Sequence, residues 1–109
     1  MSLTLEKSTL KFDGRALVGG KRVAALDGQV FDCVSPVDGQ VLTQIARCAQ
    51  ADVDAAVASG RQAFEDKRWC GMAPAQRKRI MIRFADLVQQ HGDELALLET
   101  LDMGKPVKY

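Results

Sequence analysis

The stretch "LETLDMGKP", from Leu98 to Pro106, decides how the second half of this chain folds. Gly104 follows the last apolar positions of a helical pattern, and a glycine there accepts the left-handed conformation that closes a helix. Pro106 has no N–H group and therefore prevents the helix from continuing. The sequence stops three residues later, at Tyr109. Because a helix end followed by a corner normally leads to another element, we expect this chain to be a fragment of a larger fold.

Working back from this stretch, the second half of the chain predicts three helices. The first is expected to start at Asp52 as its N-cap, and it contains Gly60, whose low helix propensity predicts the close approach of another backbone. Pro74 predicts the start of the second helix and Gly92 its end. The third helix is expected to take Asp93 as its N-cap. The apolar stripes, at helical spacing, are Val53, Ala56, Val57, Gly60 and Phe64; Ile80, Phe84, Leu87 and Val88; and Leu95, Leu98 and Leu101.

The first half of the chain predicts two β-hairpins. Gly19-Gly20 separates two short apolar segments and suits a two-residue turn with positive φ angles. Asp38-Gly39 separates "VFDCV" from "VLTQIA", and Pro36 limits the first of these strands because it donates no ladder hydrogen bond. The chain alone is therefore predicted to be α+β, with two β-hairpins followed by three helices.

Composition limits the classes of function. The 109 residues are 47% hydrophobic and 27% charged, which is typical of a globular domain. The net charge of +1 argues against nucleic-acid binding, and no apolar stretch is long enough for a membrane span. The three cysteines, Cys33, Cys48 and Cys70, form no CxxC pair, which favours a reducing, cytoplasmic environment. A chain of this size buries few side chains, so we expect some apolar faces to need partners that it does not contain.

Asp102 raises the one open question about a binding site. It lies in the last turn of the predicted third helix, where the helix dipole is negative and disfavours a carboxylate. Glu99 precedes it by about one turn. Either Asp102 is a solvated acid or bonds to a turn after Gly104, or it holds a cation together with free carbonyl groups of the helix end. The run "QRKRIMIRF" is interpreted as a solvated helix face rather than a phosphate site, and "MGKP" lacks the spacing of a P-loop.

Taken together, "VSPVDGQVL", "QADVDAAVASGRQAF" and "MAPAQRKRIMIRFADLVQQHGDELALLETLDMGKP" resemble the N-terminal portion of an aldehyde dehydrogenase. The resemblance runs from about Leu17 to Tyr109. It implies an α/β fold overall, with a Rossmann-like coenzyme domain of which residues 16–109 are the incomplete N-terminal part and residues 1–15 a lead-in. The nearest subgroup acts on gamma-glutamyl-gamma-aminobutyraldehyde or guanidinobutyraldehyde.

The resemblance also implies a function. An intact member oxidises a small-molecule aldehyde to a carboxylic acid with NAD or NADP, using a cysteine thiolate, an oxyanion site and a glutamate base. The subgroup implies an aminated aldehyde of putrescine or arginine breakdown, and the family implies a cytoplasmic homo-oligomer, a dimer or a tetramer. The family's catalytic and coenzyme-binding residues lie beyond Tyr109, so we expect none of them here and an inactive fragment. The alternative is a free-standing interaction module that pairs through its hairpin edges.

One binding feature of the family reaches into this segment. Several members hold a monovalent cation, potassium or sodium, with two backbone carbonyls and an aspartate. By resemblance, the matching positions are the carbonyls of Cys33 and Val34 and the carboxylate of Asp102. Family members often carry threonine at the position of Cys33, so only its backbone carbonyl is expected to serve.

Overall fold

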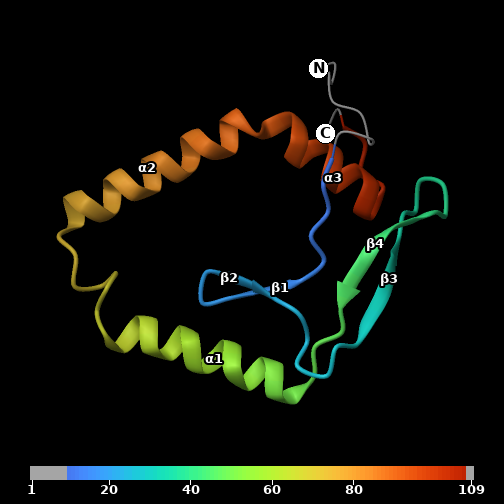
Figure 1. Cartoon of the computed structure of the whole chain (residues 1–109). Coiled ribbons are helices and arrows are strands. Elements are labelled where there is room, and N and C mark those ends of the chain that lie inside the picture. Colours follow the sequence, from blue (N-terminus) through green and yellow to red (C-terminus); the bar gives the residue numbers. More distant parts are fainter. Residues whose placement is uncertain (1–9, 108–109) are drawn as a thin grey trace.

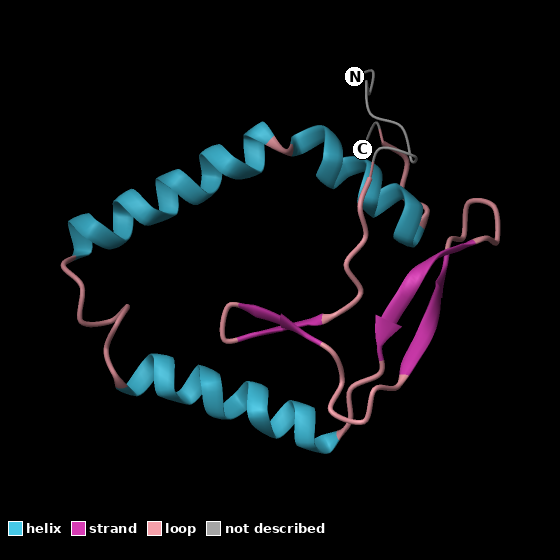
Figure 2. Ribbon diagram, in the orientation of Figure 1, coloured by secondary structure: helices cyan, strands magenta, loops and turns pink. Residues whose placement is uncertain are grey.

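The structure, a computed structural model, describes residues 10–107. Within this range, two antiparallel hairpins precede three helices, which confirms the predicted α+β order (Figures 1 and 2). The elements are β1 (Ala16–Val18), β2 (Lys21–Val23), β3 (Val30–Val34), β4 (Val41–Ala46), α1 (Gln50–Glu65), α2 (Pro74–Gln90) and α3 (Gly92–Met103).

Both hairpins turn where the sequence predicts. Gly19 and Gly20 have φ angles of 59° and 78°, the positive values that a tight two-residue turn requires. The second hairpin pairs β3 with β4, and its register shifts between Cys33 and Val34. The two hairpins form separate two-stranded sheets. Within the described residues, no strand ladder joins the two sheets.

The start of α1 differs from the prediction in one respect. Ala49, and not Asp52, is the N-cap residue, and Asp52 lies in the first turn. Its carboxylate accepts hydrogen bonds from the Ala49 N–H at 2.9 Å and from the Leu26 N–H at 2.8 Å. These two bonds, the one from Ala49 first, lower the pKa of Asp52. The acid thus satisfies free donors at the helix start from inside the helix, as the glutamate of a capping box does.

The boundary between α2 and α3 is also placed differently. Pro74 begins α2, as predicted, but α2 ends at Gln90 and Gly92 is the first residue of α3. His91 is the residue between the two helices, and its carbonyl accepts the first hydrogen bond of α3, from the Leu95 N–H at 2.9 Å. Asp93 lies in the first turn of α3 and is not its N-cap. The prediction for Gly104 is confirmed, since its φ of 80° closes α3 in the left-handed conformation.

The chain folds into a thin, open ring, in which α1 and α2 lie on opposite sides and the β1–β2 hairpin lies between them (Figure 1). Its extents are 46 × 38 × 20 Å and its radius of gyration is 17.3 Å, against about 13 Å for a compact domain of this length. The buried side chains among the described residues are Ala25, Ser35 and Leu101. None of the described helices is long and apolar enough to cross a membrane.

The apolar stripes of α1 and α2 face solvent. Val57, Phe64 and Phe84 are 63%, 65% and 62% exposed, which confirms that the chain leaves apolar faces uncovered. In the third stripe, Leu101 is buried, whereas Leu95 is 46% exposed.

Gly60 also differs from its prediction. Among the described residues, no atom other than those of its neighbours and of the surrounding α1 backbone lies within 4 Å of the position that a Cβ would take at Gly60. The close backbone approach occurs at Gly14 instead. There a Cβ would lie 1.7 Å from the Gln44 carbonyl oxygen, and the Gly14 carbonyl accepts a hydrogen bond from the Ala46 N–H at 2.8 Å.

Candidate functional site

The C-terminal end of α3 lies against the end of β3, and two hydrogen bonds join them. The buried Ser35 hydroxyl donates to the Leu101 carbonyl at 2.7 Å. The Cys33 thiol donates to Asp102 Oδ1 at 3.4 Å. We call this contact the β3–α3 junction. It brings together two stretches that carry the family resemblance, "VSPVDG" and "LDMGKP".

Ser35 also organises the turn that follows β3. Its hydroxyl accepts a hydrogen bond from the Val37 N–H at 3.2 Å. Its N–H donates to the Gln40 carbonyl at 2.8 Å, and its carbonyl accepts from the Gly39 N–H at 2.9 Å. Sequence reasoning missed this residue. A signal was available in the sequence, because a serine at the start of a turn can accept a hydrogen bond from the backbone N–H two residues later.

The α3 side of the junction is fixed by its own end structure. The Gly104 N–H donates to the Thr100 carbonyl at 2.9 Å, and the Thr100 hydroxyl donates to the Lys105 carbonyl at 2.6 Å. A Cβ at Gly104 would lie 3.4 Å from Cγ of Pro36. The corner that the sequence predicts after Gly104 is therefore held against the turn of the second hairpin.

The structure brings two of the three predicted site residues together. Cys33 is half-buried on β3 and touches Asp102 in the last turn of α3. Val34, the last residue of β3, has a side chain that is 52% exposed. By resemblance, only the backbone carbonyl of Cys33 belongs to this site. In the structure, its thiol also contacts Asp102. The thiol contact carried no signal in the sequence, because the two residues are 69 positions apart.

The environment of Cys33 keeps its thiol protonated. Burial raises the pKa of Cys33, and the hydrogen bond and negative charge of Asp102 raise it further. A reactive cysteine needs the opposite environment, one that stabilises the thiolate. Cys33 therefore does not have the character of a nucleophile.

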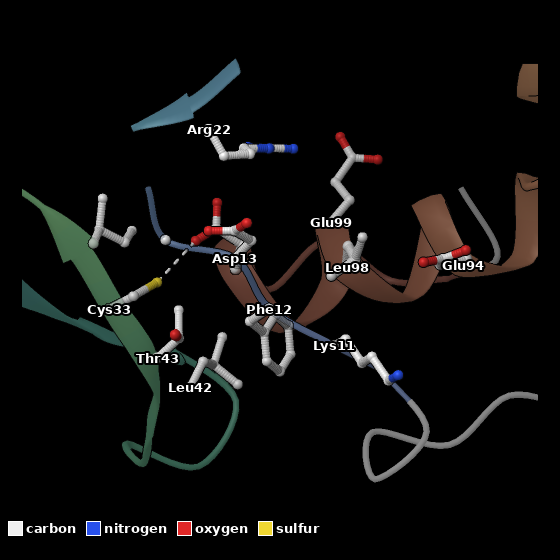
Figure 3. A pocket seen from close by; sticks show the side chains of 13 residues that line it. Lys11, Phe12, Asp13, Arg22, Cys33, Leu42, Thr43, Glu94, Leu98 and Glu99 are labelled. Atoms are coloured by element: carbon white, nitrogen blue, oxygen red, sulfur yellow. Dashed lines mark hydrogen bonds between the residues drawn. The ribbon is translucent and has the colours of Figure 1, made fainter. Parts of the chain in front are cut away.

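A cleft of about 520 Å³ opens beside the junction, between β4, α3 and the segment before β1 (Figure 3). Four carboxyl groups and two cationic groups line it. These are Asp13, Glu94, Glu99 and Asp102, with Lys11 and Arg22. Figure 3 shows Phe12 and Leu98 between the charged groups.

Several of these charges are paired. Two hydrogen bonds from the Arg15 guanidinium and one from its N–H hold Asp13. The guanidinium bonds first, and then the N–H bond, lower the pKa of Asp13 to about 2. Glu99 lies 3.8 Å from the Lys105 ammonium.

The junction offers oxygen ligands of the kind that a hard cation prefers. Asp102 supplies a carboxylate at the negative end of the α3 dipole. The register shift between Cys33 and Val34 interrupts the regular pairing of β3 at the two predicted carbonyl positions. No cluster of three or more His, Cys, Asp or Glu side chains suited to a metal occurs within residues 10–107. The predicted site differs from such a cluster because it combines one carboxylate with backbone carbonyls.

The sequence pattern of the aldehyde dehydrogenase family matches residues 23–109, and the chain belongs to this family. Among curated relatives, the aminoacetaldehyde dehydrogenase of Pseudomonas aeruginosa is 44% identical over 101 residues. The NADP/NAD-dependent aldehyde dehydrogenase PuuC of Escherichia coli is 40% identical over the same length. Each match covers 93% of this chain and 20% of the relative. The chain thus spans about one fifth of the length of these relatives.

Solved structures contain the same arrangement of elements. The indole-3-acetaldehyde dehydrogenase of P. syringae, in complex with NAD+ and IAA, is 53% identical with a TM-score of 0.89. The gamma-glutamyl-gamma-aminobutyraldehyde dehydrogenase of Burkholderia cenocepacia is 50% identical with a TM-score of 0.90. Both matches cover 93% of this chain and 20% of the solved one. The hairpins and helices described above are thus part of the aldehyde dehydrogenase fold.

Proposed function

We propose that this chain forms the N-terminal part of an NAD(P)-dependent aldehyde dehydrogenase, which oxidises an aldehyde to a carboxylic acid. The observation that carries the proposal is the family match over residues 23–109. The β3–α3 junction supports it, because two family-like stretches that are 66 residues apart in the sequence contact each other. NAD or NADP is the proposed coenzyme, in line with the NAD+ bound in a solved relative.

Within such an enzyme the segment has a structural role. We propose that the nucleophile, the general base and the coenzyme contacts are supplied from outside it. Cys33 is held as a neutral thiol, and the only histidine, His91, contacts Glu94 at 3.3 Å rather than a cysteine. The chain alone is therefore expected to be inactive. The full-length enzyme is proposed to be a cytoplasmic dimer or tetramer.

The proposed substrate class is an aminated aldehyde of putrescine or arginine breakdown. Two relatives support it by their names, the aminoacetaldehyde and the gamma-glutamyl-gamma-aminobutyraldehyde dehydrogenases. The test is to disrupt the gene that encodes this segment in its host. Loss of growth on putrescine as nitrogen source is expected, while growth on ammonium is retained. Unimpaired growth on putrescine, with loss of indole-3-acetaldehyde oxidation in extracts, would assign indole-3-acetaldehyde as the substrate instead.

We further propose that Asp102 and the carbonyls of Cys33 and Val34 hold a potassium or sodium ion in the complete enzyme. The ion would neutralise the carboxylate at the negative end of α3 and stabilise the junction. In the complete enzyme, Asp102→Ala should abolish any rise in melting temperature when potassium chloride replaces choline chloride. Glu99→Gln, in the same cleft, is the control and should retain that rise. An unchanged potassium response in Asp102→Ala would exclude the site.

A chimera tests the family function directly. Residues 10–107 of this chain replace the matching segment of the aminoacetaldehyde dehydrogenase of the first comparison. The chimera should reduce NAD+ or NADP+ in the presence of aminoacetaldehyde, measured by NADH or NADPH fluorescence. The 109-residue chain alone should not. A chimera that melts cooperatively but shows no activity would contradict the proposed function.

A further inference from the structure

We propose that the side chain of Cys33 positions the Asp102 carboxylate to bind the cation at the β3–α3 junction. This inference rests on the proposed potassium or sodium site, and it gives the thiol of Cys33 a role that is separate from that of its carbonyl. The family resemblance implies only the carbonyl. The role of the thiol follows from the way in which β3 and α3 are joined.

The ligands of the proposed site come from two elements that are far apart in the sequence. The carbonyls of Cys33 and Val34 belong to β3, at its register shift. The carboxylate of Asp102 belongs to the last turn of α3. A cation can join these ligands only if the carboxylate is held close to the carbonyls. The contacts between β3 and α3 therefore decide how well the site is formed before the cation binds.

Ser35 fixes the backbone of the junction but not the carboxylate. Its hydroxyl donates to the Leu101 carbonyl at 2.7 Å, one residue before Asp102. This bond holds the end of α3 against β3, and it leaves the side-chain torsion angles of Asp102 free to change. Asp102 is an exposed residue, so packing within residues 10–107 does not fix its carboxylate either.

The thiol of Cys33 supplies the missing constraint. It donates to Oδ1 of Asp102 at 3.4 Å, and a dashed line marks this bond in Figure 3. Among the described residues, no other group forms a hydrogen bond or an ion pair with this carboxylate. One carboxylate oxygen is thus tied to β3, whereas the other, Oδ2, remains available to a ligand.

The cationic side chains near the junction do not take the place of a cation. Lys11 and Arg22 line the same cleft, and neither is paired with Asp102 within residues 10–107. Lys105 follows Asp102 closely in the sequence, but its ammonium group lies 3.8 Å from Glu99. A carboxylate at the negative end of a helix dipole is stabilised by a positive charge, so the position held by the thiol favours a cation.

The constraint should raise the affinity of the site for the cation. A ligand group that is already held in place loses less conformational entropy when it binds. Loss of a residue that orients a metal ligand lowers metal affinity by about 10–100-fold. A thiol is a weak hydrogen-bond donor, and we therefore expect an effect at the lower end of this range.

Two substitutions of nearly equal size separate the donor from the shape of the side chain. Cys33→Val removes the hydrogen-bond donor, and Cys33→Thr replaces the thiol with a hydroxyl donor. Each is prepared in the complete enzyme, and the melting temperature is followed as potassium chloride replaces choline chloride at constant ionic strength. Cys33→Val should raise the potassium concentration of the half-maximal response by about tenfold. Cys33→Thr should retain the original value.

Two further variants control for the loss of a cysteine and for the added bulk. Cys48 is exposed and lies in a separate cleft beside α1, so Cys48→Val should leave the half-maximal potassium concentration unchanged. If Cys33→Val does not fold, Cys33→Ala takes its place, since it removes the donor without adding bulk. The same rise in the half-maximal concentration is then expected.

Equal half-maximal concentrations in Cys33→Val and Cys33→Thr would overturn the proposal. So would a Cys33→Val enzyme that melts lower by the same amount in potassium and in choline chloride, because the thiol would then only stabilise the fold. In both cases, a potassium response that Asp102→Ala abolishes would still support the cation site. An unmodified enzyme without a potassium response would exclude the site and the role of Cys33 together. Aldehyde oxidation enters none of these measurements, so a failure of the proposed activity is recognised separately.

Discussion

At the scale of single residues, Ser35 is the most completely buried polar side chain within residues 10–107. It is fully buried, and its hydroxyl both accepts from Val37 and donates to Leu101. The Leu101 carbonyl is one of the last in α3, where carbonyls lack partners within the helix. Ser35 thus satisfies a helix end from a turn that lies 66 residues earlier.

Ser35→Ala should therefore destabilise the β3–α3 junction. It removes the donor to the Leu101 carbonyl and leaves that group buried without a partner, at a cost of about 1–3 kcal/mol. Chemical denaturation of the chimera measures the loss. Ser59→Ala, in the middle of α1, is the control and should have little effect, because alanine is the better helix former. Equal losses in the two variants would show that the hydroxyl of Ser35 is not important.

Asp52 should make the start of α1 sensitive to acid. Its pKa is lowered in the folded state by the N–H groups of Ala49 and Leu26. Because the folded pKa lies below the unfolded one, Asp52 stabilises the fold at pH values above its ordinary pKa of 3.8. This contribution is lost as the pH falls below that value through the folded pKa.

We expect the helical circular dichroism of the chain to decrease over that acidic interval. In Asp52→Asn the decrease should be smaller and the helix content at neutral pH lower. Asp54→Asn, two residues further into α1, is the control and should titrate like the original chain. A titration curve of Asp52→Asn that matches the original would contradict the role of this carboxylate.

The candidate site shows how far residue-level prediction reaches. The family resemblance identified Cys33 and Asp102, and the structure places them in contact at 3.4 Å. Ser35 was missed because its partner is a backbone carbonyl, which any residue at position 101 would supply. The thiol of Cys33 was missed because a contact across 69 residues depends on how the intervening helices return the chain to β3. Neither contact leaves a pattern in the local sequence.

At the scale of elements, the signals predicted correctly are those with a single physical meaning. Gly19-Gly20 fits a turn with two positive φ angles, Pro74 fits the first turn of a helix, and Gly104 closes one. The errors occurred at residues with two possible positions. An acid such as Asp52 can satisfy the same free N–H groups from the N-cap or from inside the first turn. Gly92 can end one helix or start the next.

Gly60 gives a prediction at the scale of α1. In the isolated chain, Gly60→Ala should raise helix stability by about 1 kcal/mol, since nothing lies near the added methyl group. Circular dichroism across a thermal scan measures this gain. Gly14→Ala is the contrasting control, because its Cβ would clash with the Gln44 carbonyl at 1.7 Å. A Gly60→Ala chain that loses helix would show that the space above Gly60 is occupied.

At the scale of the whole molecule, the ring is wider than a compact domain and buries few side chains. Burial of a Val, Ile or Phe side chain contributes about 1.5–3 kcal/mol, and the apolar stripes of α1 and α2 lack this contribution at several positions. The three helices and two hairpins themselves were predicted correctly from the sequence. Their placement in an open ring was not predictable, because the stripes alone do not say what lies against them.

The isolated chain should therefore expose apolar surface to probes. We expect strong fluorescence of 1-anilinonaphthalene-8-sulfonate and concentration-dependent self-association in sedimentation velocity. Ile80→Asp should weaken both more than Ile82→Asp does, because Ile80 belongs to the apolar stripe of α2, whereas Ile82 lies on the other side of that helix. A monomer with a sharp cooperative melt and no dye binding would contradict this picture of the chain.

The hydrogen bond from Ser35 to Leu101 has a consequence for folding order. It closes a loop across 66 residues, and such distant contacts form more slowly than those within a helix or hairpin. We expect α1 and α2 to gain structure before this loop closes. The chain between these two residues contains α1 and α2, so this contact is expected to form in the last step of folding.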